Sequence, residues 1–446
     1  MTSAAQTGPM RIRGAAVSVL LVVAIALPLA AVLTIVRGVP FELPGQQRSF
    51  DQRTDGQRAV DTAQQSLVAS PNDPKLLSSL GLAYLLRVRE TGDASYYSRA
   101  EQLVRQALAA NPEEITTLLA AGSLSLGRHE FPTALVYGRH AIAVAPFTAA
   151  GHGIVTDALV ELGRYDEAIV AAQRMVDLRP DLASYSRVAY VRELHGDLVG
   201  ATTAMRAAVE AGNPASEGTA WTEVQLGHLL FTIGDLDGAE RQYESSRNRV
   251  IDYVYGVAGV ARVRAARGDL RGAAQLYEKA VARLPLPAFA AELGDVYVKL
   301  GDQTRAEQQY ALVAASWKLL SAGGVRTDID QALFDADHER NLPAALVAAR
   351  TEYEIRKTVP VVGTLAWAEY RSGDLEAARR HTAEALRLGT QDPLLFYRSG
   401  VIAEAAGDVQ QAKTLYGRAS ALNPRFSVLF ADDLAARLSR LSANGG

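Results

Sequence analysis

Apolar and small residues follow a helical spacing along this chain, and turns interrupt that spacing at regular intervals. In ELGRYDEAIVAAQRMVDLRP, residues 161–180, the turn at Gly163 is followed by Ala168 and Ala172 at helical spacing and then by Pro180. Glycine permits the backbone conformation that ends one helix, and proline cannot continue the next one. The stretch therefore predicts a turn, then a helix that packs closely through small residues, and then the end of that helix.

The same order recurs along most of the chain. A small residue just past a turn stands at intervals of 33 to 39 residues, most of them 33 or 34, at Ala100, Ala134, Ala168, Ala201, Ala239, Ala273, Ala306, Ala345, Ala378 and Ala412. Turns such as Gly196-Asp197 precede it, and we expect the Asp to cap the following helix. Larger residues four positions on, such as Tyr243, and small ones three further share one helix face. A period near 34 in a helical chain indicates a repeat architecture.

The ends of the repeat region also fit a helical array. Residues 55–71 are predicted to form a helix like the second helix of a repeat unit, without a first helix before it. Residues 426–441 predict an amphipathic helix whose polar face can contact water. An open-ended array needs such a terminal helix. The segment around residues 317–328 is irregular, and the period stretches to 39 there.

The first residues predict a membrane segment. Residues 1–14 form a polar tail, and residues 15–36 carry no charge. As a helix, this run is about 33 Å long, enough to cross a hydrocarbon core of ~30 Å. Secretory signals have a shorter apolar region. We therefore expect a transmembrane anchor, with residues 37–54 as a linker and the body outside the cytoplasm. The alternative is a signal that is cleaved near residue 26 or 38.

Composition narrows the chemistry. The net charge is −3, and no Lys/Arg block marks a nucleic-acid surface. The chain has no cysteine, which excludes disulfides, thiolate zinc sites and cysteine nucleophiles. It has no Gly-rich phosphate loop and no Gly-x-Ser-x-Gly, so we expect no cofactor and no small-molecule substrate. Asp337 and His338 are the one charged pair that could ligate a metal; a solvated helix end is the favoured interpretation.

The repeat resembles the tetratricopeptide repeat family over roughly residues 74–424. The resemblance rests on first-helix patches such as Leu80-Gly81-Leu82-Ala83-Tyr84, on the Gly-Asp turns and on the alanines named above. It implies an all-α, right-handed solenoid of about ten antiparallel helix pairs, here over residues 55–424, with residues 425–446 as a capping helix and tail. In this family the first helices form a concave groove that binds peptides or partner proteins.

The groove in this chain is expected near its centre. The periodicity places seven side chains there: Arg187, Tyr190, Trp221, Gln225, His228, Tyr255 and Arg262. Aromatic and arginine side chains together suit peptide recognition. The alternative is that Trp221 and Tyr255 pack between units, because aromatic residues at helical spacing are usually core.

These observations favour a non-enzymatic, membrane-tethered scaffold that binds a protein or peptide partner, with bacterial envelope assembly or secretion as the setting. Two other functions stay open. The chain could be a secreted or periplasmic protein released by cleavage, or a metal-dependent accessory enzyme that uses Asp337 and His338.

Overall fold

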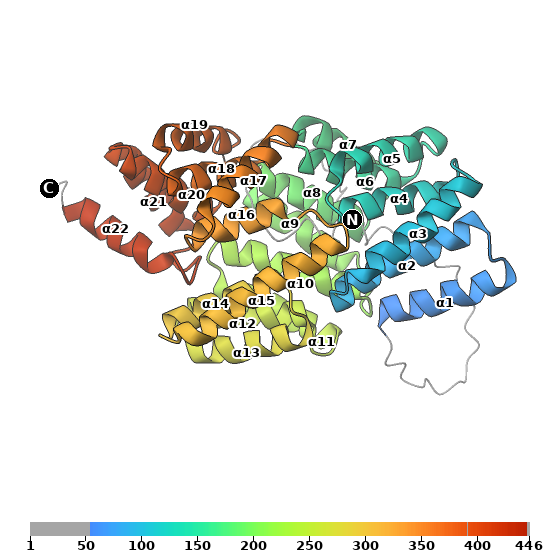
Figure 1. Ribbon diagram of the computed structural model, residues 1–446, viewed down its shortest axis with the longest axis horizontal. Helices are drawn as coiled ribbons and strands as arrows, with labels where there is room; N and C mark the ends of the chain where they lie inside the picture. Colours follow the sequence, from blue (N-terminus) through green and yellow to red (C-terminus); the bar gives the residue numbers. More distant parts are fainter. Residues whose placement is uncertain (1–53, 390, 444–446) are drawn as a thin grey trace, which may run out of the picture.

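The computed structural model describes residues 54–389 and 391–443, and all regular elements in these residues are α-helices, 22 in number. They form an array of antiparallel pairs (Figure 1). The all-helical solenoid predicted from the sequence is confirmed. Among these residues, none of the helices combines the length and the apolar character needed to cross a bilayer. The predicted transmembrane segment 15–36 and the preceding tail lie outside the described residues.

Ten pairs lie between a lone first helix and a terminal helix. We call the first helix of each pair the A helix and the second the B helix. The lone helices are α1 (Asp55–Ala69) and α22 (Ala431–Ala443). The A helices are α2 (Pro74–Thr91), α4 (Ile115–Gly127), α6 (Ala149–Glu161), α8 (Leu182–Leu194), α10 (Glu217–Thr232), α12 (Val254–Ala266), α14 (Pro287–Lys299), α16 (Asp328–Asp337), α18 (Val359–Arg371) and α20 (Pro393–Ala405). The B helices are α3 (Ser95–Ala110), α5 (Phe131–Val144), α7 (Tyr165–Leu178), α9 (Leu198–Glu210), α11 (Leu236–Arg249), α13 (Leu270–Arg283), α15 (Gln303–Ala322), α17 (Leu342–Ile355), α19 (Leu375–Ala385) and α21 (Val409–Leu422).

The turns within pairs use the predicted residues. Gly196 has a φ of 63° and Gly234 a φ of 78°, values in the left-handed region that glycine adopts without strain. The carboxylate of Asp197 then accepts a hydrogen bond of 2.7 Å from the backbone N–H of Gly200 and caps α9. Asp235 caps α11 in the same way. These local interactions fix where each B helix begins.

Small residues occupy the contacts between helices. All ten alanines of the sequence repeat are at most 2% exposed. On α10, a Cβ added to Gly227 would lie 2.4 Å from the ring of Tyr243, so the ring occupies the space that glycine leaves. The same ring also lies against Gly259 of α12. A single tyrosine on a B helix thus packs between two successive A helices.

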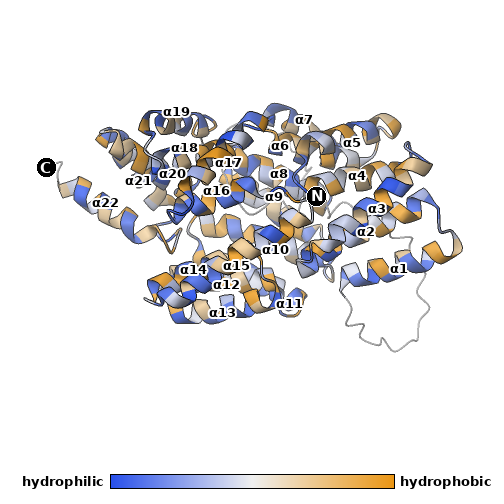
Figure 2. Cartoon of the chain, in the orientation of Figure 1, coloured by the Kyte–Doolittle hydropathy of each residue, from blue (hydrophilic) through white to orange (hydrophobic). Residues whose placement is uncertain are grey.

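The A helices form the inner layer of the array. The backbones of A helices come close together at places such as α2 with α4 and α16 with α18, whereas successive B helices of the described residues touch through side chains such as Tyr353 and Glu384. Helix α4 is buried over nearly its whole length, while α5 has exposed positions on one side. Figure 2 shows the corresponding mixture of hydrophobic and hydrophilic residues along the outer helices. This arrangement puts the candidate groove on the A helices.

The array divides at the irregular segment that the sequence indicated. Most buried apolar residues of α16 to α22 form one core, which extends from Ile329 to Leu441, while Val359 of α18 belongs to the core of α4 to α8. Among consecutive helices in the described part of the chain, the backbones of α15 and α16 have the least close contact. Phe334 of α16 bridges the gap by packing on Trp317 of α15, with ring centroids 5.3 Å apart. We call α16–α22 the C-terminal array.

Segments almost two hundred residues apart meet where the array has completed one turn. The printed sequence separations of these contacts are 192, 194, 195 and 197, or about six 34-residue units. We call this set of contacts the seam. It joins four residue pairs: His129 with Arg326, Glu161 with Arg356, Tyr165 with Val359, and Phe231 with Asn423.

Candidate functional site

The seven residues predicted to line the groove all lie on three neighbouring A helices. Arg187 and Tyr190 are on α8, Trp221, Gln225 and His228 on α10, and Tyr255 and Arg262 on α12. The structure distributes them over an aromatic cluster, a chain of polar contacts and a buried ion pair.

The aromatic cluster is centred on Trp221. Its indole meets the ring of Tyr255 edge-on, with centroids 4.9 Å apart, and the guanidinium of Arg89 lies 5.7 Å from the indole centroid. Tyr255 also contacts Tyr253 and Phe289, at 5.3 and 5.7 Å. Edge-to-face packing and a cation over an aromatic face are both favourable. The cluster joins α2 of the first pair to α10, α12 and α14.

Trp221 itself keeps one unused polar group. The side chain is 7% exposed, and its buried Nε1 has no hydrogen-bond partner among the described residues. Gln225, one helical turn further on α10, is also buried. A buried indole N–H without an acceptor is unfavourable, since it has lost its hydrogen bond to water. The site thus offers a donor to an incoming acceptor.

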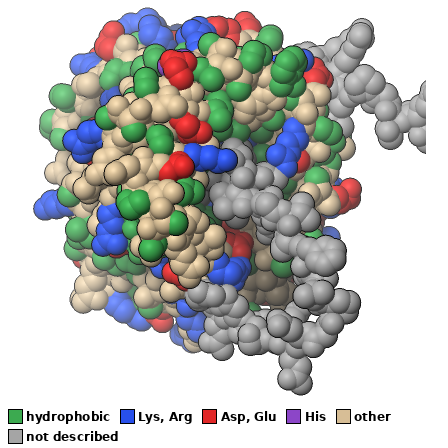
Figure 3. Space-filling model, turned by 90° about the vertical axis from the view of Figure 1, so that its right-hand side faces the viewer, with side chains coloured by type: hydrophobic (Ala, Val, Ile, Leu, Met, Phe, Trp, Pro, Cys, Tyr) green, Lys and Arg blue, Asp and Glu red, His purple; other side chains and the backbone are tan. Residues whose placement is uncertain are grey.

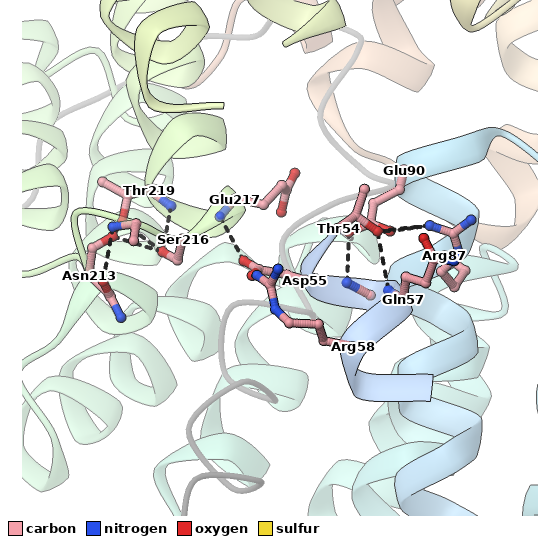
Figure 4. Close-up of polar contacts among 12 residues, drawn as sticks. Thr54, Asp55, Gln57, Arg58, Arg87, Glu90, Asn213, Ser216, Glu217 and Thr219 are labelled. Carbon is pink, nitrogen blue, oxygen red and sulfur yellow. Dashed lines mark hydrogen bonds and ion pairs between the residues drawn. The ribbon is translucent and has the colours of Figure 1, made fainter. Parts of the chain in front are cut away.

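A polar junction lies beside this cluster. Glu217, at the start of α10, forms a buried ion pair with Arg89 and accepts a hydrogen bond from the hydroxyl of Tyr253. Its backbone N–H donates to the carboxylate of Asp55, at 2.9 Å, as Figure 4 shows. Burial raises the pKa of Glu217, although Arg89 opposes the shift. The first described helix is therefore attached directly to the N-terminus of α10.

The other side of the junction is held by α2. The Glu90 carboxylate accepts from the hydroxyl of Thr54 at 2.6 Å, from the backbone N–H of Gly56 at 2.8 Å and from Arg87 at 2.7 Å (Figure 4). A carboxylate at the start of a helix satisfies N–H groups that have no partner within the helix. These contacts place α1 on α2 at the rim of the inner face.

His228 and Arg262 belong to a chain of polar contacts across five helices. The Nδ1 atom of His228 lies 2.8 Å from the hydroxyl of Tyr243 and 2.9 Å from the guanidinium of Arg262. Because both neighbours donate, Nδ1 accepts, and burial holds the pKa of His228 well below its usual value. Arg262 continues the chain by pairing with Glu292 of α14, which also accepts from Tyr277.

Arg187 is part of the inner packing. Its guanidinium forms two hydrogen bonds with the carboxylate of Asp157 on α6, at 2.9 and 2.6 Å, and the side chain is 1% exposed. It also donates to the backbone oxygen of Ala183, at 3.0 Å. Tyr190 packs against the core of α4 to α8. These two residues connect neighbouring A helices.

Sequence reasoning missed Arg89, Glu217 and Tyr253. They surround Trp221 although Arg89 and Glu217 are 128 residues apart. No local pattern identified them, because their contact depends on the curvature of several units together. The periodicity did place Trp221 and Tyr255 together, since they lie on neighbouring A helices at equivalent depth.

The pair proposed as a metal ligand set is engaged in other contacts. Asp337 accepts from Arg398 at 2.6 Å and from the indole of Trp367 at 2.9 Å. His338 lies 2.8 Å from Asp295 and 2.8 Å from the backbone oxygen of Phe334. The interpretation as a solvated helix end is wrong for these two side chains, because both are largely buried. In the part of the chain that the structure describes, no group of three or more His, Asp or Glu is arranged to hold a metal.

The charge around the inner face is mixed. Figure 3, which views the end of the molecule that carries α1, shows acidic and basic side chains next to each other on this face. Further inside, the arginines Arg89, Arg187 and Arg262 each pair with a carboxylate. The surface therefore favours no strongly charged ligand.

Comparison with known proteins identifies the repeat. Residues 364–427, which cover α18 to α21, match the model of a family described as tetratricopeptide repeat. No curated protein matches the chain. A tetratricopeptide repeat protein from Parabacteroides merdae is 17% identical, with 58% of this chain and 98% of that chain covered and a TM-score of 0.34.

Two other solved structures cover more of this chain. A human IFIT1 dimer with PPP-AAAA is 12% identical and covers 83% of this chain and 95% of its own, with a TM-score of 0.43. Yeast Tom70 is 12% identical, covers 87% of this chain and 86% of its own, and has a TM-score of 0.36. With TM-scores below 0.5, these structures carry no argument about what this chain binds. The matched segment is thus similar to a tetratricopeptide repeat, and the helix pairs on either side of it continue the same arrangement through the described residues.

Proposed function

We propose that this protein is a membrane-tethered scaffold whose inner face binds an extended segment of a protein partner outside the cytoplasm, in bacterial envelope assembly or secretion. Tetratricopeptide repeats mediate protein–protein interactions and are generally non-catalytic. The right-handed superhelix expected of the family would shape the inner face into a continuous groove.

The observation that carries the proposal is the unused indole N–H of Trp221. An extended peptide presents a backbone carbonyl at regular intervals, and such a carbonyl would satisfy the buried donor. The aromatic faces of Trp221 and Tyr255 would contact apolar side chains of the same peptide. Because the inner arginines are already paired, we expect a ligand of low net charge.

Selection of peptides tests this proposal. The full-length chain in nanodiscs is used to select from a library of random peptides displayed on phage, and the affinities of enriched peptides are measured by fluorescence anisotropy. Trp221→Phe retains the aromatic ring and removes the N–H. We expect it to weaken binding about fivefold, as loss of a hydrogen bond of ~1 kcal/mol requires.

Trp317→Phe is the matched control, since this tryptophan lies on α15 against Phe334 and away from the inner cluster. It should bind the peptides like the unmodified chain. If Trp221→Phe retains full affinity while a Tyr255→Ala variant that stays folded also does, the inner face is not the binding surface.

The tether and its orientation need separate experiments. We infer a single-pass anchor from the uncharged run of residues 15–36. Carbonate extraction of membranes should leave the protein in the pellet, and protease added outside the inner membrane should digest the body. N-terminal sequencing of the isolated protein decides between an anchor and a cleaved signal, because cleavage near residue 26 or 38 would release a soluble form.

A further inference from the structure

Four residues of α10 lie in one row that begins at the N-terminus of the helix: Glu217, Trp221, Gln225 and His228. Spacings of four, four and three residues place them on the same side of the helix. At a rise of about 1.5 Å per residue, the row is about 16–17 Å long. We call it the α10 stripe, and it belongs to the inner face, where the indole of Trp221 meets the ring of Tyr255.

Three polar groups of the α10 stripe have no partner among the described residues. The first is the buried indole N–H of Trp221. Gln225 is 7% exposed, and its side-chain amide makes no hydrogen bond with another described residue. Because the Nδ1 atom of His228 accepts from Tyr243 and Arg262, its Nε2 atom carries the proton of the neutral ring and is the third group. Two donors and one amide in a row complement the carbonyl and N–H groups of a peptide backbone.

The described chain begins beside the N-terminal end of the α10 stripe. The hydroxyl of Thr54 donates to the carboxylate of Glu90 at 2.6 Å, and the next residue, Asp55, accepts from the backbone N–H of Glu217 at 2.9 Å (Figure 4). These bonds hold Thr54 close to the point where the stripe starts. The preceding residues, which lie outside the described part of the chain, are covalently attached at this point.

A short piece of the preceding chain is long enough to follow the whole stripe. An extended chain spans about 3.3–3.6 Å per residue, so five residues cover about 16–18 Å. Phe50 is four residues before Thr54, which allows a separation of up to about 14 Å. Trp221 lies one helical turn, about 6 Å, from Glu217. The ring of Phe50 is therefore within reach of the Trp221 indole.

The composition of residues 44–53, PGQQRSFDQR, also fits the stripe. Arg48 and Arg53 against Asp51 give this segment a net charge of +1. A nearly neutral segment suits an inner face whose arginines already pair with carboxylates. The three glutamines carry amides that both donate and accept hydrogen bonds. The ring of Phe50 would extend the edge-to-face contacts of the aromatic cluster.

We propose that residues 44–53 dock on the α10 stripe and occupy the inner face of their own chain. A backbone carbonyl of this segment accepts the indole N–H of Trp221, and the ring of Phe50 packs on the aromatic cluster. A partner peptide has to displace the segment, so the protein is autoinhibited. The docking stands by itself, whereas the competition rests on the function proposed above. Cleavage near residue 26 or 38 would leave the docking segment in place.

Disulfide trapping in the full-length chain in nanodiscs tests the docking. The chain has no cysteine, so Ser49→Cys and Gln225→Cys introduce a single pair, which forms a disulfide only if the Cα atoms come within about 7 Å. The control combines Ser49→Cys with Val199→Cys, a site on the outer helix α9 that is 81% exposed. We expect the first pair to oxidise at least about tenfold faster, because docking raises the effective concentration of its thiols. Equal rates would overturn the proposal.

A second copy of the chain is the other possible source of the segment. Chains that carry only Ser49→Cys and chains that carry only Gln225→Cys are reconstituted in the same nanodiscs and oxidised. We expect few cross-linked dimers compared with the disulfide formed within the doubly substituted chain. Dimers that form as fast as the intramolecular disulfide would assign the segment to a neighbouring copy and overturn docking within one chain.

Peptide affinity tests the autoinhibition. Phe50→Ala should make the phage-selected peptides bind about tenfold more tightly, as expected if about nine molecules in ten are docked. Phe41→Ala is the matched control, because it removes the same ring outside the docking segment and should leave the affinity unchanged. Unchanged affinity of Phe50→Ala would overturn the autoinhibition. If no peptide is selected, the function proposed above fails, and the disulfide rates still decide the docking.

Discussion

The hydroxyl of Tyr165 accepts a hydrogen bond of 3.0 Å from the backbone N–H of Val359, which lies 194 residues further along the chain. In a simple solenoid each unit contacts only its neighbours, and stability is a sum of local terms. This bond and the others at the seam connect units that are about six apart. The array is therefore more cooperative than a linear stack of helix pairs.

Tyr165→Phe should lower the free energy of unfolding by ~1–3 kcal/mol, because the buried N–H of Val359 loses its acceptor. Urea denaturation followed by circular dichroism measures the loss. Tyr137→Phe on α5, a half-buried tyrosine, is the control and should cost less than ~0.5 kcal/mol. Equal stability of the two variants would show that the seam does not contribute to folding.

Gly227→Ala should destabilise the protein by ~1–3 kcal/mol, since the new methyl group would lie 2.4 Å from the ring of Tyr243. Gly417→Ala provides the opposite case. Gly417 is an exposed residue inside α21, and a Cβ there meets nothing within 4 Å. We expect this second change to stabilise the protein by up to ~1 kcal/mol, through higher helix propensity. Thermal or urea unfolding of the pair tests whether close helix contact, and not glycine itself, sets the difference.

Arg187→Ala should cost ~3–5 kcal/mol, because it leaves the Asp157 carboxylate buried without its partner. Arg164→Ala, which breaks a partly exposed pair with Glu167, should cost less than ~1 kcal/mol. Unfolding curves of both variants distinguish two roles for Arg187. A variant that unfolds like the unmodified protein but loses peptide binding would assign Arg187 to the ligand and contradict the packing role.

His338 predicts a pH dependence of stability at the junction between α14 and α16. Burial alone would lower its pKa, but the hydrogen bond to Asp295 and the charge of that residue raise the pKa overall. Burial also raises the pKa of Asp295. Because the pKa of His338 is raised in the folded state, its contribution to the free energy of unfolding is complete below pH ~6.5. This contribution is lost as the pH rises further.

Guanidinium chloride titrations at several pH values measure this effect. The difference in unfolding free energy between the unmodified protein and His338→Gln should be largest at pH 6 and smaller at pH 9. His140→Gln, at a partly exposed pair with Glu113, should cost less than ~1 kcal/mol. A His338→Gln difference that stays constant with pH would mean that the histidine is not charged in the folded protein.

The local architecture could be predicted from particular residues. Ala168 and its equivalents marked the helix contacts, and the Asp197 and Asp235 turns marked where B helices begin. Each of these features involves residues that are close in the sequence or in adjacent units. Their physical causes, left-handed glycine, a capped N-terminus and close approach of helices, act over one or two turns of helix.

The candidate site was predicted only in part. The periodicity brought Trp221 and Tyr255 to neighbouring helices, but it did not reveal that Arg89 lies over the indole or that Glu217 pairs with Arg89. It also treated Arg187 as a groove residue, whereas the structure places its guanidinium against Asp157. The repeat period predicts which face of a helix a residue occupies. It does not predict which distant carboxylate pairs with an arginine on that face.

The sequence by itself determined the repeating unit, its helices and its small-residue contacts, because these depend on interactions between neighbours. Only the tertiary structure decided which units meet across the seam and how Arg356 comes to pair with Glu161. Each unit adds a small rotation to the one before it, and about six rotations accumulate before the chain meets itself. A small change in the rotation of one unit would shift every later contact, so residues such as Tyr165 and Val359 cannot be paired from local patterns.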